Sequence, residues 1–192
     1  MSRFRHVELQ YASRLLNHGP TILITSYDAP SDRRNVMAAA RSMPVEFAPP
    51  RVAIVVDKST GRGRSSSAMA PSALWFPASQ PPAGPTPSAA SAAAMRTNSM
   101  PGIPVVTGPE LGLPLIEEKC LAWMECRLLP ATAAQTQYDT LFGEVVSAAA
   151  DERAFVTGRW QFDDDKLNTL HHLGTGNFVA SGRHVRANSL DE

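Results

Sequence analysis

The order of hydrophobic and polar positions predicts one short helix followed by strands in the first part of the chain. Apolar residues recur at helical spacing within residues 7–16, and Gly19 and Pro20 then stop the helix. Three runs rich in β-branched or small apolar residues follow at 21–26, 35–40 and 51–56, with turn formers at 28–32. We therefore expect residues 1–60 to be β-rich behind one helix.

The pattern resumes after residue 107. In residues 120–129 the polar Glu125 and Arg127 alternate with apolar neighbours, which predicts a long half-buried strand. Residues 138–149 carry further apolar positions, and 155–162 reads as strand, turn and strand. Closely spaced strands without a GxGxxG pattern or a P-loop favour a barrel of mainly β (α+β) class over a doubly wound sheet.

The middle of the chain has a different composition. Between residues 61 and 100 the only Ile, Leu or Val is Leu74, and no acidic residue occurs from Lys58 to Pro109. Prolines fall among Ala and Ser, a composition that buries too little apolar area to offset chain entropy. We expect residues 62–101 to be irregular, although so long a linker inside one compact domain is uncommon.

Composition and charge narrow the class of protein. A chain of 192 residues with 43% hydrophobic residues suits one domain, residues 1–192. The 18 basic residues balance the 18 acidic ones, so we expect no nucleic-acid partner. No run approaches the about 20 apolar residues of a membrane span, so we expect a cytoplasmic protein without a membrane partner. Cys120 and Cys126 lack zinc or redox spacing and are expected to be buried thiols.

Several runs in the outer segments resemble the flavin reductase-like family. They are Arg14 to Thr21, Asn35 to Ala39, Asp57 to Thr60, Pro114 to Glu117, Phe142 to Val146 and Leu170 to Gly174, within about residues 1–60 and 102–186. The resemblance implies an FMN-binding split β-barrel, flavoredoxin-like, with a few flanking helices. It also implies a homodimer with flavin near the subunit interface, and NADH or NADPH as the reductant of the flavin.

The segment between these runs departs from the family. There the family has a helix and strand and then a phosphate-side motif like G-S-V-S-G-R-D-x-D-K-F. Suppose that the coding sequence of residues 88–99 is read in a shifted frame, in which the third base of each codon is joined to the first two bases of the next. This segment can then encode G-S-V-S-G-R-D-E-D-K-F. The same shift across residues 64–77 allows the preceding family pattern. We interpret residues 62–101 as a compensated frameshift that removes the Ser, Arg and Lys of the phosphate site.

The resemblance also names cofactor-binding residues. The strand is expected to run along the flavin ring at Asn35, Val36, Met37 and Ala38. The alternative is that these residues form an ordinary barrel strand that contacts no ligand. Asp57, Lys58, Ser59 and Thr60 offer hydroxyls, a cation and backbone N–H groups suited to phosphate, or form only a turn. His171 and His172 point to opposite faces of an extended segment, so one of them, taken as His171, lies near the flavin.

Three functions remain open at this stage. The first is an NAD(P)H:flavin oxidoreductase that feeds a monooxygenase or another electron acceptor. The second is an FMN-binding electron carrier without reductase turnover. The third is a damaged product with impaired flavin binding. Metal binding is not expected, because Asp163, Asp164 and Asp165 beside the His pair read as a solvated loop. No catalytic residue is named by the sequence.

Overall fold

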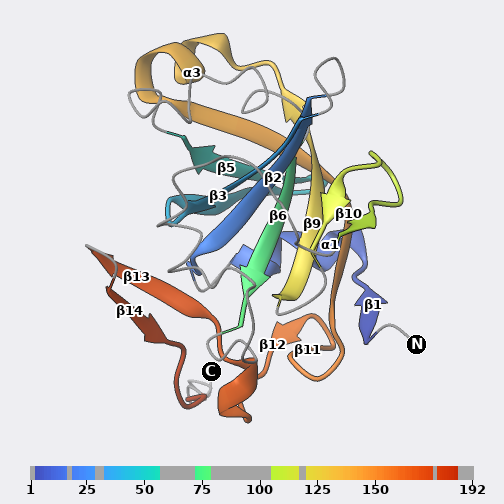
Figure 1. Cartoon of the computed structure of the whole chain (residues 1–192), viewed down its shortest axis with the longest axis vertical. Helices are drawn as coiled ribbons and strands as arrows, with labels where there is room; N and C mark the ends of the chain where they lie inside the picture. Colours follow the sequence, from blue (N-terminus) through green and yellow to red (C-terminus); the bar gives the residue numbers. More distant parts are fainter. Residues whose placement is uncertain are drawn as a thin grey trace, which may run out of the picture.

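The computed structural model describes residues 3–16, 19–28, 33–56, 72–78, 105–116, 120–174 and 177–185. Within them the chain is mainly β, as predicted, with two short helices and two 3-10 turns (Figure 1). The first half contains β1 (Phe4–His6), α1 (Leu9–Ala12), η1 (Ser13–Leu16), β2 (Ile22–Asp28), β3 (Arg33–Ala39), β4 (Ser42–Phe47), β5 (Pro50–Val55) and β6 (Ser72–Pro77). The second half contains β7 (Val106–Thr107), β8 (Pro114–Leu115), β9 (Cys120–Leu129), α3 (Thr132–Tyr138), β10 (Thr140–Asp151), β11 (Phe155–Val156), β12 (Arg159–Trp160), η4 (Asp165–Leu167), β13 (Leu170–Gly174) and β14 (Asn177–Ala180).

One antiparallel sheet organises the described chain. Its strands run in the order β3-β2-β6-β9-β10-β5-β4, and β1 adds to the far end of β10. Side chains from β2, β5, β6, β9 and β10 meet in one buried cluster with the η1 residues Leu15 and Leu16. Residues of β3 at one end of the sheet and β5 near the other belong to this cluster, so the sheet curves around a shared core. The helix expected in 7–16 is confirmed as α1 and η1.

A second buried cluster covers part of the opposite face. The hairpin β7–β8 brings Leu113 and Leu115 onto Leu23 and Trp123 of the sheet, and Phe4 of β1 joins them. The buried hydroxyl of Thr25 donates to the carbonyl of Pro114 at 2.9 Å, which fixes β8 to β2. Trp123 is a core aromatic, with 6% of its surface exposed.

The expectation of an irregular segment at 62–101 is wrong for residues 72–78. Ser72–Pro77 forms β6, which pairs with β2 on one side and β9 on the other. Leu74 and Phe76 are fully buried in the main cluster. A strand in the middle of a sheet needs only a few apolar side chains and two neighbouring strands for its backbone hydrogen bonds. The low content of Ile, Leu and Val over about forty residues therefore did not reveal β6. The rest of 62–101 lies outside the described residues.

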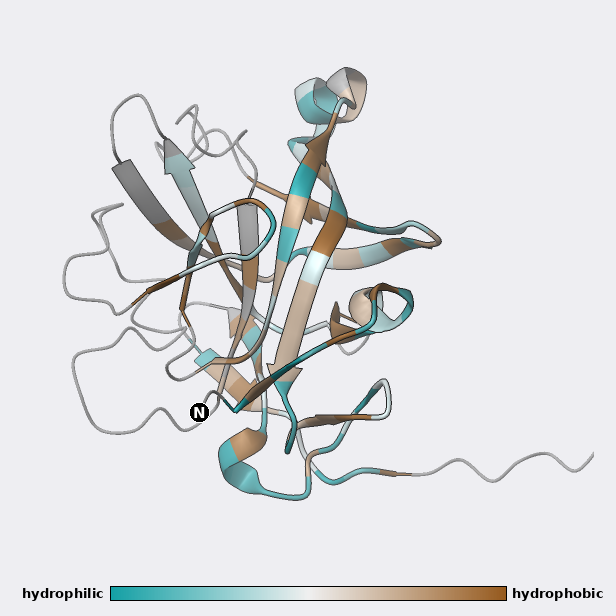
Figure 2. Ribbon diagram, turned by 90° about the vertical axis from the view of Figure 1, so that its right-hand side faces the viewer, coloured by the Kyte–Doolittle hydropathy of each residue, from teal (hydrophilic) through white to brown (hydrophobic). Residues whose placement is uncertain are grey.

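Two further differences concern single strands. Residues 42–47, which no pattern marked as a strand, form the edge strand β4 beside β5. The strand at 120–129 has the predicted bounds but not the predicted exposure, because its first seven residues are all buried. Glu125, expected on a solvent face, is fully buried. Figure 2 shows hydrophobic and hydrophilic stretches along the long strands of the sheet.

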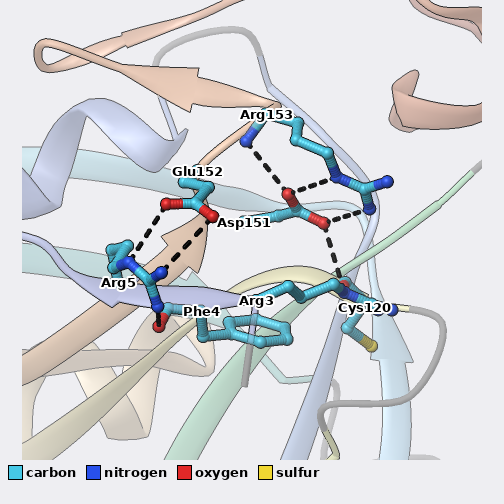
Figure 3. Close-up of polar contacts among 7 residues, drawn as sticks. All are labelled: Arg3, Phe4, Arg5, Cys120, Asp151, Glu152 and Arg153. Carbon is cyan, nitrogen blue, oxygen red and sulfur yellow. Dashed lines mark hydrogen bonds and ion pairs between the residues drawn. The ribbon is translucent and has the colours of Figure 1, made fainter. Parts of the chain in front are cut away.

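A polar clamp fastens β1 to the end of β10 (Figure 3). The buried carboxylate of Asp151 accepts hydrogen bonds from Arg153 Nε at 2.9 Å and Nη2 at 2.7 Å, and Arg3 Nε lies 3.1 Å from it. Arg5 pairs with Glu152 at 3.0 Å. Burial acts to raise the pKa of Asp151, but the hydrogen bonds and charge of Arg153, together with the charge of Arg3, hold that pKa below its ordinary value. This arrangement orders the N-terminal strand.

Candidate functional site

The strand β3 is the last strand at its end of the described sheet. Its side chains alternate between the two buried clusters: Val36 and Ala38 pack on one side, and Met37 and Ala39 on the other. Val36 is only 3% exposed. Since both faces of β3 are packed, this strand offers a ligand its outer backbone edge more than its side chains. A row of alternating N–H and C=O groups suits the amide-like edge of a planar ring.

The structure places His171 near one end of β3. The backbone N–H of Thr21 donates to the carbonyl of Leu170 at 2.7 Å, and Ile22, the next residue, pairs with Ala39. His171 is half-buried, whereas the neighbouring His172 is exposed and its ring lies 5.2 Å from that of Phe178. Because neighbouring residues of a strand point to opposite faces, the expected division between the two histidines is present in β13.

The segment Asp57 to Thr60 lies outside the described residues, but its starting point is described. The backbone N–H of Val55 donates to the carbonyl of Arg41, and that of Val56 to the carbonyl of Asp139, both at 2.9 Å. Arg41 follows the end of β3 by two residues. The chain therefore enters the predicted phosphate segment close to the end of β3. In Figure 1 the β13–β14 hairpin projects from the body on the side where β3 and β5 end.

These positions define the candidate site: the outer edge of β3 and the sheet end around Ala39, His171 and Val56. Asn35 pairs with Ser26 and lies four residues before Ala39, which is about 13 Å along the strand. The structure does not bring Asn35 and His171 into contact, and the side chain of Asn35 is outside the described part. A ligand that reaches both must be elongated. FMN, a planar ring with a ribityl phosphate, has that shape.

Sequence reasoning missed a buried acid that fixes a loop over the sheet. Glu125 Oε2 accepts the backbone N–H of Glu110 at 2.9 Å, and Oε1 accepts that of Leu111 at 3.0 Å. Gly108 packs so closely that a Cβ there would overlap the carboxylate and lie 2.6 Å from its Cδ. The signal in the sequence that could have revealed this burial is the position of Glu125 as the only acidic residue of the apolar segment 120–129. Glu125 is thus a structural anchor of the β7–β8 hairpin.

Two other groups of reactive side chains lie apart from the candidate site. Asp151 ends β10, whereas Thr140 at its start pairs with Val55, so the clamp is about 35 Å along the strand from the site. Both cysteines are buried and free, as expected. Burial raises the pKa of each thiol to about 12. The charge of Arg3 acts to lower the pKa of Cys120, whereas the charge of Glu125 raises the pKa of Cys126 further. The thiols are therefore inert at neutral pH.

Among the described residues, no group of three or more His, Cys, Asp or Glu side chains gathers to hold a metal ion. A search of the same residues found no helix both long and apolar enough to cross a membrane.

Comparison with known proteins gives the same family as the sequence motifs. Residues 14–163 match the family model described as the flavin reductase like domain. The chain is 64% identical over 197 aligned positions to the uncharacterized protein YddH of Escherichia coli K12, covering 97% of this chain and all of YddH.

Solved structures agree with this result. An FMN-binding domain of a flavin reductases-like enzyme from Shewanella baltica superposes with a TM-score of 0.77 and 32% identity, covering 96% of this chain and 97% of that one. A flavoredoxin from Methanosarcina acetivorans shares the fold, with a TM-score of 0.67 and 18% identity over 89% of each chain. This protein belongs to the flavin reductase-like family and has the FMN-binding fold of that family.

Proposed function

We propose that this protein is an FMN-dependent oxidoreductase that takes hydride from NADH or NADPH onto flavin. The observation that carries the proposal is the family match over residues 14–163, together with a β3 edge whose packed faces leave its backbone for a planar ring. When bound, FMN supplies the hydride chemistry, and the protein supplies position and electrostatics.

Each part of the candidate site has a separate task in this proposal. The backbone edge from Asn35 to Ala38 orients the ring, and the small side chain of Ala38 leaves that edge accessible. Asp57, Lys58, Ser59 and Thr60 receive the phosphate, where a cation and N–H donors give charge-assisted hydrogen bonds. His171, on the half-buried face of β13, lies toward the ring and the nicotinamide. A homodimer and an external acceptor, such as a monooxygenase, complete the proposal.

The second candidate is an FMN-binding electron carrier without reductase turnover. Residues 88–99 favour instead the damaged product with impaired flavin binding, because other residues stand at the positions of the family's Ser, Arg and Lys for the phosphate. Charge-assisted bonds contribute about 1.5–3 kcal/mol each, so the loss of two weakens phosphate binding by at least about a hundredfold. Steady-state oxidation of NADH and NADPH with added FMN separates the two functions, because only a reductase consumes nicotinamide catalytically.

The flavin site itself is tested by titration with FMN, followed through quenching of flavin fluorescence. We expect His171→Ala and Asn35→Ala each to weaken binding by about tenfold, the equivalent of one polar contact. His172→Ala is the matched control, since His172 is exposed on the opposite face of β13 and should leave the affinity unchanged. Equal affinities for the two histidine variants would remove His171 from the site. Absence of saturable binding by the unaltered protein would contradict the proposed function.

A further inference from the structure

One row of residues crosses the face of the sheet that the β7–β8 hairpin covers, from Glu125 to the candidate site. In the strand register Glu125 of β9 is opposite Ala73 of β6, and Ala73 is opposite Thr25 of β2. Thr25 in turn is opposite Val36 of β3. Directly opposed residues of antiparallel strands point to the same face, so Glu125, Thr25 and Val36 share one face. The row covers three strand spacings, about 14 Å.

The β7–β8 hairpin is attached to this row at two separate strands. The carboxylate of Glu125 accepts the N–H groups of Glu110 and Leu111 at 2.9 and 3.0 Å, which ties the turn of the hairpin to β9. The hydroxyl of Thr25 donates to the carbonyl of Pro114 at 2.9 Å, which ties β8 to β2. The hairpin therefore extends from β9 to β2, the strand beside β3.

From β2 the packing of the hairpin continues to β3. Val36 belongs to the same buried cluster as Leu113 and Leu115, and Ala38 packs against that cluster. Val36 and Ala38 are the side chains behind the backbone edge that the proposed function assigns to the flavin ring. In the described sheet β3 has a neighbouring strand on one side, β2, so the contacts on its faces fix its position as much as its hydrogen bonds do.

The turn of the hairpin is built around the carboxylate of Glu125. The N–H of Gly108 donates to the carbonyl of Leu113 at 2.8 Å and closes the turn, and a Cβ at Gly108 would overlap the carboxylate. Converging backbone N–H groups favour a negatively charged oxygen. Because hydrogen bonds to a charged acceptor are stronger than those to a neutral one, an uncharged side chain of the same shape would hold this turn less firmly.

We propose that Glu125 is a positioning residue of the flavin site, which holds the β7–β8 hairpin as a support that keeps the backbone edge of β3 in place. Glu125 acts on β3 through the hairpin and makes no contact with the flavin. The inference rests on the proposed function and deepens it, because it names a residue three strands away that determines flavin affinity. Coupling between two sites is reciprocal, so bound FMN should in turn hold the hairpin more firmly.

The experiment is FMN titration of the full chain by quenching of flavin fluorescence, at a temperature where thermal melts show each variant to be folded. Glu125→Gln keeps the shape of the side chain and removes its charge, and Gly108→Ala displaces the carboxylate. Each should weaken FMN binding by about tenfold, within the usual range of coupling between separate sites. Phe155→Leu is the matched control, because it lowers stability in the main cluster, outside the cluster of the hairpin, and should leave the affinity unchanged.

Hydrogen exchange adds a measurement that a general loss of stability would not change. In the unaltered protein, FMN should slow the exchange of the N–H groups of Glu110 and Leu111 more than that of Gln161. The N–H of Gln161 is also hydrogen-bonded, at 2.8 Å to the carbonyl of Ala154, but it lies outside the hairpin. In Glu125→Gln this selective protection should be lost.

The outcomes separate this inference from the proposed function. Saturable FMN binding by the unaltered protein, with equal affinities in the hairpin variants and the control, would overturn the inference and leave the proposed function standing. Equal weakening in Phe155→Leu, or equal protection by FMN at Glu110 and Gln161, would also overturn it. If Glu125→Gln does not fold, Gly108→Ala decides by the same comparison. Unaltered protein that binds no FMN would contradict the proposed function and this inference with it.

Discussion

The contact between Gly108 and Glu125 allows a quantitative test of how the β7–β8 hairpin is held. The change is Gly108→Ala, which adds one methyl group. The backbone at Gly108 is not in the left-handed region, so alanine is strained only by the carboxylate that its Cβ would overlap. To make room, Glu125 must give up its hydrogen bonds to the N–H groups of Glu110 and Leu111, which measure 2.9 and 3.0 Å.

The magnitude follows from those two bonds. Hydrogen bonds to a charged group contribute about 1.5–3 kcal/mol each, and Glu125 is fully buried, so solvent screening is small. We expect Gly108→Ala to lower the free energy of unfolding by about 3 kcal/mol. In a Glu125→Ala background the obstacle is gone, and the same change should cost less than about 1 kcal/mol. The coupling between the two sites is then about 2 kcal/mol.

Urea denaturation of the four proteins in this cycle measures the coupling. Gly182→Ala is the matched control, because a Cβ there meets nothing within 4 Å and its backbone is likewise outside the left-handed region. Additive costs for Gly108→Ala and Glu125→Ala would refute the reasoning, since they would show that the carboxylate does not occupy the space beside Gly108.

Three further predictions concern other parts of the chain. Because the pKa of Asp151 is lowered, its bonds to Arg153 stabilise the fold at pH values above the ordinary pKa of a carboxyl group, and this contribution is lost as pH falls through the lower pKa of the folded state. Asp151→Asn should therefore lower the free energy of unfolding by about 2 kcal/mol at pH 7 and by progressively less toward pH 3. Urea titrations at several pH values would measure this difference. Cys120 and Cys126, with pKa values near 12, should not react with a thiol reagent at pH 8 until the protein is unfolded, and rapid native labelling would contradict their burial. Replacing residues 62–101 with their shifted-frame reading should raise FMN affinity and the melting midpoint together, whereas equal affinities and equal midpoints would overturn this account of the phosphate site. On resequencing, an uninterrupted family frame would identify a sequencing artefact, and the same bases again would identify a real lesion in the gene.

The local sequence determined most of the strands and the family. Residues 120–129 form a strand with the predicted bounds, and the strands expected at 21–26, 35–40 and 51–56 are present as β2, β3 and β5. These segments are predictable because the two-residue period of a strand and its β-branched residues are local properties. The family motifs are equally local, and their identification is confirmed by the match over residues 14–163.

Tertiary structure decided which face each strand presents and what covers it. Glu125 alternates with apolar residues as a solvent-facing acid would, yet the turn at 108–111 buries it, and that contact joins positions distant in sequence. Leu74 and Phe76 form a central strand because β2 and β9 supply hydrogen bonds on both sides. In β3 the side chains of Val36 and Met37 pack into different hydrophobic clusters on opposite faces of the strand, and both clusters form only in the folded chain. Burial and register are properties of assembled strands, so the sequence by itself determines most of the strands but not their partners.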